Sequence, residues 1–180
     1  MTQQQVHSDL TGSTPPSGPD FSSVTPIFDV SRVDFGAQMV GRHDIAKWNP
    51  HRGDMALLDA IVWHSDDFTE GVALRSVRND EFWVDGHFPG RPLFPGVLMV
   101  ETAAQLCCYL FLKGRGEPGT AAFTRIEDTS FRAAVEPGDD LFILSREVKR
   151  GRRRFVCDCQ GVVADKLCFE SRVSGVLLDP

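Results

Sequence analysis

Residues 95–113 read PGVLMVETAAQLCCYLFLK. Pro95-Gly96 suits the first turn of a helix, and Gly114, Gly116 and Pro118-Gly119 follow the apolar run, so we expect a helix over about residues 95–113. Apolar side chains cover almost every side of that helix. A helix that is apolar all round is buried rather than lying on a surface. The stretch therefore predicts one long buried helix.

The segments around this helix show the apolar and polar patterns of strands, with turn residues between them. We expect strands over residues 55–63, 71–84, 122–135, 141–149, 155–160 and 162–178, and a short helix over residues 43–48. One buried helix among antiparallel strands indicates a hot-dog fold of the α+β class, in which the sheet wraps around the helix.

The chain has 180 residues, enough for one domain with a substantial core. Residues 1–23 are rich in Gln, Ser, Thr, Pro and Gly, and we expect a disordered tail there. Residues 24–42 alternate only weakly and form an N-terminal extension whose structure the pattern does not define. Residues 43–178 are expected to form the hot-dog domain.

The formal net charge of -6 makes the whole molecule a poor match for nucleic acid or an anionic membrane. The apolar run over residues 97–112 is shorter than the roughly 20 residues that span a bilayer, so we expect no membrane insertion. The N-terminus lacks the features of a secretory signal, and an odd count of 5 cysteines then indicates free thiols in a cytoplasmic protein. Cys157 and Cys159 lie in a strand-like run with no His at ligand spacing, so no metal site is expected.

Two polar residues near the buried helix are candidates for acid–base chemistry. Glu101 lies one turn into the helix, with Gln105 on the same face. A buried carboxyl is normally paired, protonated or functional, although a position at the helix edge or a cap on a neighbouring backbone is an alternative. His87 lies in the Gly- and Pro-rich loop before the helix, which can fold the imidazole back towards the helix start. Together they suggest an acid–base pair.

Gly96 provides a third candidate group. Backbone amides in the first turn of a helix are unpaired and carry the positive end of the helix dipole. They can polarise a thioester carbonyl and stabilise the enolate that forms when an α-proton leaves. Glycine lets a substrate approach the backbone closely. A simple Pro-Gly helix start is the alternative.

Residues 86–105 (GHFPGRPLFPGVLMVETAAQ) resemble the signature of the 3-hydroxyacyl-[acyl-carrier-protein] dehydratases, the FabA/FabZ group. The His, the Pro-Gly, the acid and the Gln fall at the family's spacing, and a Glu at position 101 is similar to the FabZ branch. Weaker matches lie at residues 50–52, 57–59, 131–132 and 135–139, so the resemblance covers residues 43–178. Residues 53–55 and Ala60 depart from the family pattern. The resemblance therefore does not define the tunnel entrance or the choice of acyl chain length.

The resemblance implies a dehydratase that converts a 3-hydroxyacyl thioester to the trans-2-enoyl thioester without a cofactor. It implies that His87 takes the α-proton, that Glu101 gives a proton to the departing hydroxyl, and that the Gly96 amide binds the thioester carbonyl. The substrate tunnel would be lined by Phe88, Pro95, Val97 and Gln105. The family's site is built across a homodimer, with the His and the acid from different chains, and a trimer of dimers is a further possibility.

In this family the acyl group travels on acyl carrier protein, an acidic partner. We expect docking by basic residues, namely Arg132, Lys149, Arg150, Arg152, Arg153 and Arg154. A solvated turn is the alternative for residues 149–154. Two other functions stay open, because a fold alone does not fix function: an acyl-thioester hydrolase, and a non-catalytic subunit that pairs with a different chain. The pattern does not separate fatty-acid from polyketide or specialised lipid synthesis.

Overall fold

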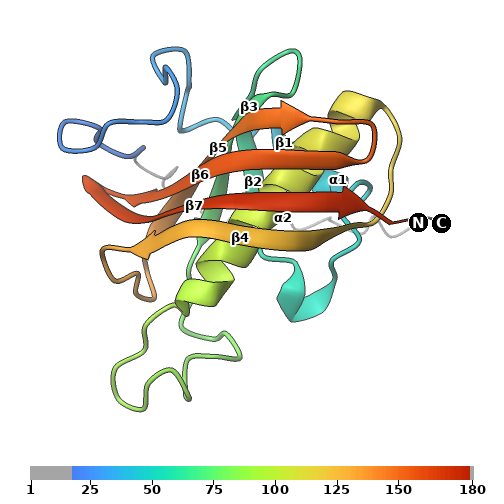
Figure 1. Ribbon diagram of the computed structural model, residues 1–180. Coiled ribbons are helices and arrows are strands. Elements are labelled where there is room, and N and C mark those ends of the chain that lie inside the picture. Colours follow the sequence, from blue (N-terminus) through green and yellow to red (C-terminus); the bar gives the residue numbers. More distant parts are fainter. Residues whose placement is uncertain (1–17, 179–180) are drawn as a thin grey trace, which may run out of the picture.

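An antiparallel sheet of seven strands wraps around one long helix (Figure 1). The computed structural model describes residues 18–178, and most of the tail expected over residues 1–23 lies outside them. The strands are β1 (Val40–Gly41), β2 (Ala60–His64), β3 (Glu70–Ser76), β4 (Ala121–Phe131), β5 (Asp140–Arg150), β6 (Arg154–Val163) and β7 (Lys166–Leu177), in the order β1-β2-β3-β5-β6-β7-β4. The helices are α1 (Arg42–Ile45), the 3-10 turn η1 (Gly53–Met55) and α2 (Gly96–Arg115). The expected α+β hot-dog architecture is confirmed.

The helix α2 forms the centre of the core. From Met99 to Leu112 nearly every side chain is buried, because the curled sheet contacts α2 from β3, β5, β6 and β7. By length and composition alone α2 is able to cross a membrane, so the length argument from residues 97–112 was wrong. However, 67% of its most apolar window is buried inside the fold, as in the core helix of a globular domain. The helix ends at Gly116, whose φ of 74° is the left-handed conformation that favours glycine.

Two strands before α2 are shorter than the sequence pattern predicts. The strand expected from residue 55 begins only at Ala60, because Met55 ends η1 and residues 56–59 form no regular element. The strand expected to reach residue 84 ends at Ser76. There the backbone amide of Arg78 is bonded to the Glu81 carboxylate at 2.8 Å, which closes a turn and takes the later apolar residues out of the sheet.

The break expected between residues 160 and 162 is absent, since β6 continues to Val163 and the turn follows at residues 164–165. Gly161 does not interrupt the strand. A Cβ atom at this position would lie 2.2 Å from the ring of Phe169, so the glycine makes room for that ring. The alternation expected in β6 is confirmed, since Phe155, Cys157 and Cys159 all enter the core. The common face expected for Leu167 and Phe169 in β7 is wrong: Phe169 enters the core, whereas Leu167 packs on the opposite side of the sheet, because the pairing of β6 with β7 shifts register there.

Residues 18–39 form no regular element except turns, and they lie against the outer face of the sheet. Val24 and Phe28 are buried in a second apolar cluster with residues of β2, β3, β5 and β6. The backbone amide of Asp20 donates to Ala164 O at 2.8 Å, so the tail expected up to residue 23 is attached from residue 18 onwards. We call residues 18–39 the N-terminal segment.

Gln160 anchors the N-terminal segment, and we expect its removal to loosen that segment. Its side chain accepts from the Ile27 amide at 3.0 Å and donates to Thr25 O at 3.2 Å. Gln160→Ala leaves these backbone groups without partners, so the free energy of unfolding should fall by about 1–3 kcal/mol. Urea unfolding and limited proteolysis would measure both effects. Gln38→Ala, at an exposed position, is the matched control, and equal stability of the two variants would contradict the anchor.

Candidate active site

The loop between β3 and α2 holds the imidazole of His87 in a fixed orientation. Its backbone amide donates to Trp83 O at 2.8 Å, and its carbonyl accepts from the Leu93 amide at 2.7 Å. Its Nδ1 lies 2.7 Å from Leu93 O. Because a carbonyl oxygen only accepts, Nδ1 carries a proton, and in the neutral ring Nε2 is left with a lone pair. The geometry therefore suits His87 as a proton acceptor.

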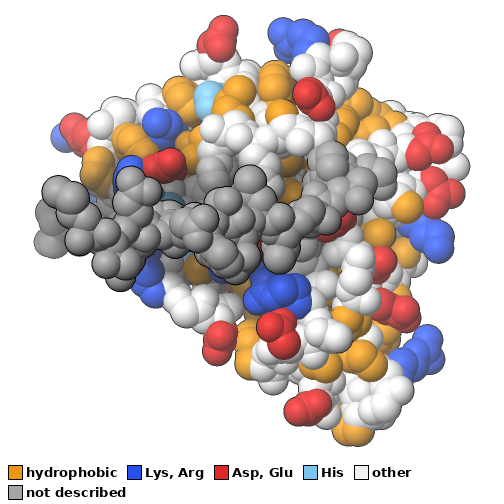
Figure 2. All heavy atoms as spheres, turned by 180° about the vertical axis from the view of Figure 1, so that it is seen from behind, with side chains coloured by type: hydrophobic (Ala, Val, Ile, Leu, Met, Phe, Trp, Pro, Cys, Tyr) orange, Lys and Arg blue, Asp and Glu red, His pale blue; other side chains and the backbone are white. Residues whose placement is uncertain are grey.

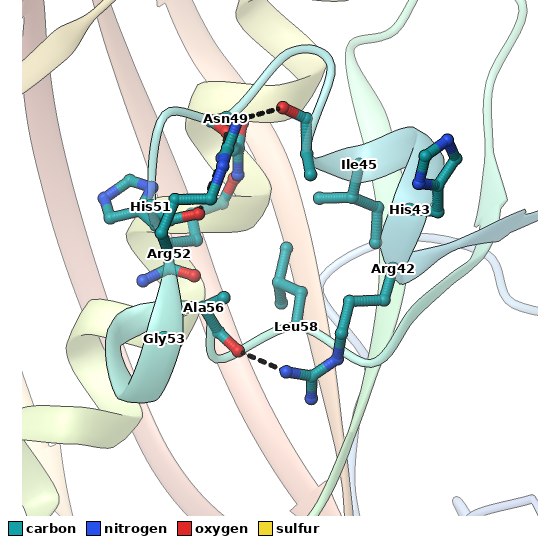
Figure 3. A pocket seen from close by; sticks show the side chains of 11 residues that line it. Arg42, His43, Ile45, Asn49, His51, Arg52, Gly53, Ala56 and Leu58 are labelled. Carbon is teal, nitrogen blue, oxygen red and sulfur yellow. Dashed lines mark hydrogen bonds between the residues drawn. The ribbon is translucent and has the colours of Figure 1, made fainter.

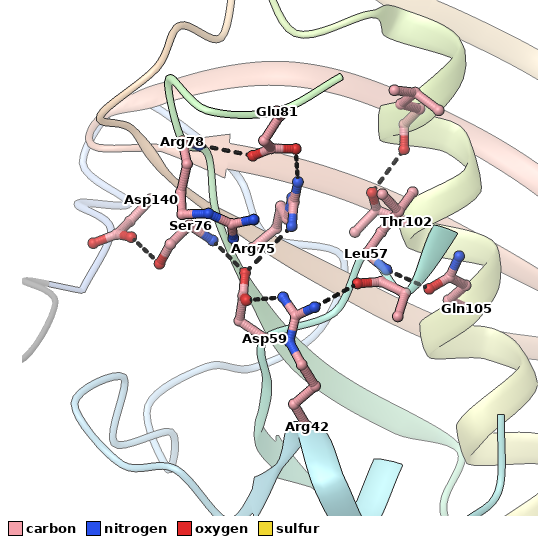
Figure 4. A network of polar contacts seen from close by, with 12 residues as sticks. Arg42, Leu57, Asp59, Arg75, Ser76, Arg78, Glu81, Thr102, Gln105 and Asp140 are labelled. Carbon is pink, nitrogen blue, oxygen red and sulfur yellow. Dashed lines mark hydrogen bonds and ion pairs between the residues drawn. The ribbon is translucent and has the colours of Figure 1, made fainter. Parts of the chain in front are cut away.

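A buried ion pair ties this loop to β3 (Figure 4). The side chains of Arg75 and Glu81 are only 3% and 5% exposed, and Glu81 also accepts from Trp83 Nε1 at 3.1 Å. Burial lowers the pKa of Arg75, whereas the charges of Glu81 and Asp59 act to raise it. Since Trp83 O binds the His87 amide, the ion pair fixes the base of the His87 loop.

Glu101 projects from the first turns of α2 and is about one-fifth exposed. Its Oε1 accepts from Gln105 Nε2 at 2.9 Å and lies 3.3 Å from His51 Nε2. The buried Gln105 also accepts from the Leu57 amide at 3.0 Å and donates to Met55 O at 2.8 Å. Glu101 is therefore paired with two side chains, and it does not cap a backbone group within residues 18–178.

Gly96 is the first residue of α2, and no acceptor within residues 18–178 is bonded to its amide. A Cβ atom here would lie 2.8 Å from the ring of Phe131. The packing of that ring therefore requires a glycine at this position. This is a second explanation for Gly96, beside the close approach of a substrate that the sequence suggested. The free amide and the helix dipole both favour a partial negative charge at this point.

The structure does not gather all the expected tunnel residues in one chain. Gln105 lines a pocket of about 590 Å³ beside α1 and η1, together with Ile45 and Leu58 (Figure 3). Pro95 is buried, whereas Phe88 and Val97 are 52% and 74% exposed. Figure 2 shows hydrophobic side chains on the surface at the lower end of the molecule, where Figure 1 places the loop between β3 and α2. Within residues 18–178 no hydrogen bond or ion pair joins His87 to Glu101.

The expected docking residues lie at the two ends of α2. Arg132 follows β4 beside the helix start and forms an ion pair with Glu170. The hairpin of residues 149–154 lies at the other end (Figure 1), where Arg115 Nη1 donates to Arg152 O. A helix rises about 1.5 Å per residue, so the hairpin lies about 20 Å from Glu101 along the axis. Two of its other basic residues have partners, since Arg150 pairs with Glu147 and Arg153 donates to Leu177 O. Lys149 and Arg154 line a surface pocket.

The cysteines show no features of nucleophiles. All 5 are free and buried. Burial raises the pKa of Cys108 to about 12 and that of Cys168 to about 11, which keeps both thiols protonated. In the described part of the chain, no group of three or more His, Cys, Asp or Glu side chains is arranged to hold a metal ion.

Sequence reasoning missed two parts of the site. His51 was not proposed as a site residue, although Pro50-His51-Arg52 belongs to the weaker family matches. The pair of Arg75 and Glu81 was also missed. Its one local signal is a charged residue directly after the apolar residues 72–74 of strand β3.

Comparison with known proteins agrees with this description. The family described as FabA-like domain matches residues 49–172. The chain is 42% identical over 114 residues to the 3-hydroxyacyl-[acyl-carrier-protein] dehydratase FabZ of Yersinia enterocolitica, covering 59% of this chain and 66% of that relative. It is equally similar to the FabZ of Yersinia pestis, 62% of which it covers. The chain thus spans slightly less than two thirds of these relatives.

Solved structures show the same fold. The dehydratase heterocomplex ApeI:P from Xenorhabdus doucetiae has a TM-score of 0.65 at 16% identity, covering 75% of this chain and 91% of that one. A hypothetical thioesterase with coenzyme A from Streptococcus pneumoniae has a TM-score of 0.51 at 13% identity, covering 66% and 84%.

The wrapped sheet, the buried helix and the polar groups at its start define a hot-dog protein. The chain belongs to the FabA-like domain family.

Proposed function

We propose that this protein is a dehydratase that converts a 3-hydroxyacyl thioester to the trans-2-enoyl thioester, in fatty-acid or related lipid or polyketide synthesis. The observation that carries the proposal is the hydrogen bond of His87 Nδ1 to Leu93 O, which leaves Nε2 as a base in the loop before α2. The activity named for the FabZ relatives supports the same reaction.

In the proposed reaction His87 Nε2 takes the α-proton, and the electron pair of that C–H bond forms the new double bond. The Gly96 amide and the helix dipole stabilise the negative charge that develops on the thioester oxygen. Glu101 gives a proton to the 3-hydroxyl as its C–O bond breaks, and water leaves. The proton on His87 then returns to Glu101 through solvent. The elimination is redox-neutral and balances without a cofactor.

We propose further that the site is shared between two chains of a homodimer. In one chain His87 and Glu101 have separate partners. The strand β4 lies at the edge of the sheet, and Ile126 and Phe131 on it are each 53% exposed. An exposed edge with apolar side chains favours pairing with another chain. A trimer of dimers and a cytoplasmic location stay predictions.

The carrier of the acyl group is proposed to be acyl carrier protein, docked by the basic residues named above. Antiparallel pairing of two β4 strands would set the Ala121 end of one chain beside the Phe131 end of its partner. The hairpin of residues 149–154 adjoins the Ala121 end, because Leu177 pairs with Ala121 and its amide donates to Arg153 O. In such a dimer the hairpin and the partner's Arg132 would flank one site.

The test is to incubate the purified protein with crotonyl and trans-2-decenoyl thioesters, on acyl carrier protein and separately on coenzyme A. We expect loss of the enoyl absorbance with a mass gain of one water. The carrier on which the reaction is faster identifies the partner that delivers the acyl group. Release of free thiol without hydration would instead identify a hydrolase. If none of the four thioesters changes, the proposal of an enzymatic function is rejected and a non-catalytic subunit is favoured.

A further inference from the structure

We infer that His51 is a positioning residue for Glu101, which fixes the oxygen of the carboxyl group that carries the acid proton. The inference rests on the function proposed above and concerns the turn between α1 and η1, far in sequence from both the His87 loop and α2. It adds a third ionisable side chain to the reaction centre.

The contact involves one carboxyl oxygen only. His51 Nε2 lies 3.3 Å from Glu101 Oε1, and Gln105 Nε2 donates to that same oxygen at 2.9 Å. Within residues 18–178, Glu101 Oε2 has no bonded partner. The side chains of His51 and Glu101 are 24% and 21% exposed, so the contact is largely shielded from water.

This asymmetry assigns different roles to the two oxygens. An oxygen that receives N–H donors is the acceptor, carbonyl-like oxygen of a protonated carboxyl group, and the proton then lies on the other oxygen. In Glu101 the acid proton would therefore lie on Oε2, the oxygen left free for the 3-hydroxyl of the substrate. A contact of 3.3 Å is long for a hydrogen bond, but such contacts in a free enzyme tighten when substrate binds.

The surroundings of His51 favour the neutral ring with its proton on Nε2. Its Nδ1 is buried and has no hydrogen-bond partner among the described residues. A buried N–H group without an acceptor is rarer and costlier than an unused lone pair. An imidazolium would have such a group at Nδ1. The neutral Nε2–H tautomer avoids it.

The turn that carries His51 is fixed to α2. Asn49 Nδ2 donates to Gln105 O at 2.8 Å, one helical turn beyond Glu101. The Arg52 guanidinium closes the turn by donating to Asn49 O and Ala46 O at 2.8 and 2.7 Å. Figure 3 shows these side chains around the pocket that Gln105 also lines. The imidazole is therefore held by a rigid turn rather than by a mobile loop.

The test compares His51→Leu with His51→Gln, because glutamine restores an N–H donor and leucine does not. For hydration of crotonyl thioester, we expect His51→Leu to lower kcat by about 10- to 100-fold, as for other residues that orient a reacting group, and to change KM by less than about 3-fold. His51→Gln should recover most of kcat. The control is His64→Leu, which removes a part-buried histidine whose Nδ1 lies 2.9 Å from Ser65 O.

Three results would overturn the inference. The first is a kcat of His51→Leu within about 2-fold of the wild type, and the second is a loss in KM alone. The third is equal impairment of the Leu and Gln variants, which indicates a structural role. Nitrogen NMR of the His51 ring is independent of activity and should show a proton on Nε2 and none on Nδ1. If the wild type hydrates no thioester while NMR shows this tautomer, the proposed function fails and the described contact stands.

Discussion

Replacing His87 by Ala or Glu101 by Gln is expected to lower kcat for thioester hydration by about 100- to 10,000-fold, the contribution typical of a positioned general acid or base. Both side chains are only partly buried, so the folded state should survive. Stopped-flow measurement of the enoyl absorbance gives kcat, and circular dichroism checks the fold. Near-full activity in either variant would contradict the role assigned to that residue.

The same two variants test whether the site is shared. In a mixed dimer built from a His87→Ala chain and a Glu101→Gln chain, a shared arrangement leaves one site with both substitutions and one intact site. Random mixing of subunits should then restore about a quarter of the wild-type activity, because half of the dimers are mixed and half of their sites are intact. If each site uses one chain only, mixing restores nothing.

Replacing Glu81 by Ala is expected to give the largest loss of stability, about 3–5 kcal/mol. The reason is that Arg75 would stay buried as a cation without its main partner, and Asp59, at 3.7 Å, would be its one remaining ion-pair partner within residues 18–178. Urea unfolding measures the loss. Glu117→Ala is the matched control, because Glu117 is 74% exposed and its pair with Arg115 should contribute less than about 1 kcal/mol.

A double variant separates the charge from the packing. Arg75→Met combined with Glu81→Leu replaces both members of the buried pair by apolar side chains, and it should recover much of the stability that Glu81→Ala loses. If Glu81→Ala lowers the free energy of unfolding by no more than Glu117→Ala does, the ion pair of Arg75 and Glu81 does not hold the His87 loop.

The central helix was predictable because its signals are local. Pro95 at its start, Gly116 at its end and apolar residues on all sides are visible in the sequence, and the structure agrees within two residues. The end of β3 was not predictable in the same way. Phe82 and Trp83 continue the apolar pattern, but the turn at Arg78 depends on a contact with the Glu81 carboxylate.

The candidate site likewise combines residues with local sequence signals and residues without them. His87, Glu101 and Gln105 lie close together in the sequence, and their spacing predicts one reaction centre. His51 lies 50 residues before Glu101, and its contact exists only because the turn after α1 folds onto α2. Contacts of this kind are set by tertiary packing, which no short-range pattern records.

The N-terminal segment adds a layer to the fold, on the outer face of the sheet. Helix, sheet and N-terminal segment form three layers, so the middle strands have dry surfaces on both sides. That accounts for the unbroken apolar runs at residues 60–62, 72–74 and 141–144, whose neighbouring side chains enter opposite apolar clusters. Strands that are solvated on one face alternate instead. The N-terminal segment thus contributes a layer of packed apolar side chains, and this layer lies before residue 49, where the family match begins.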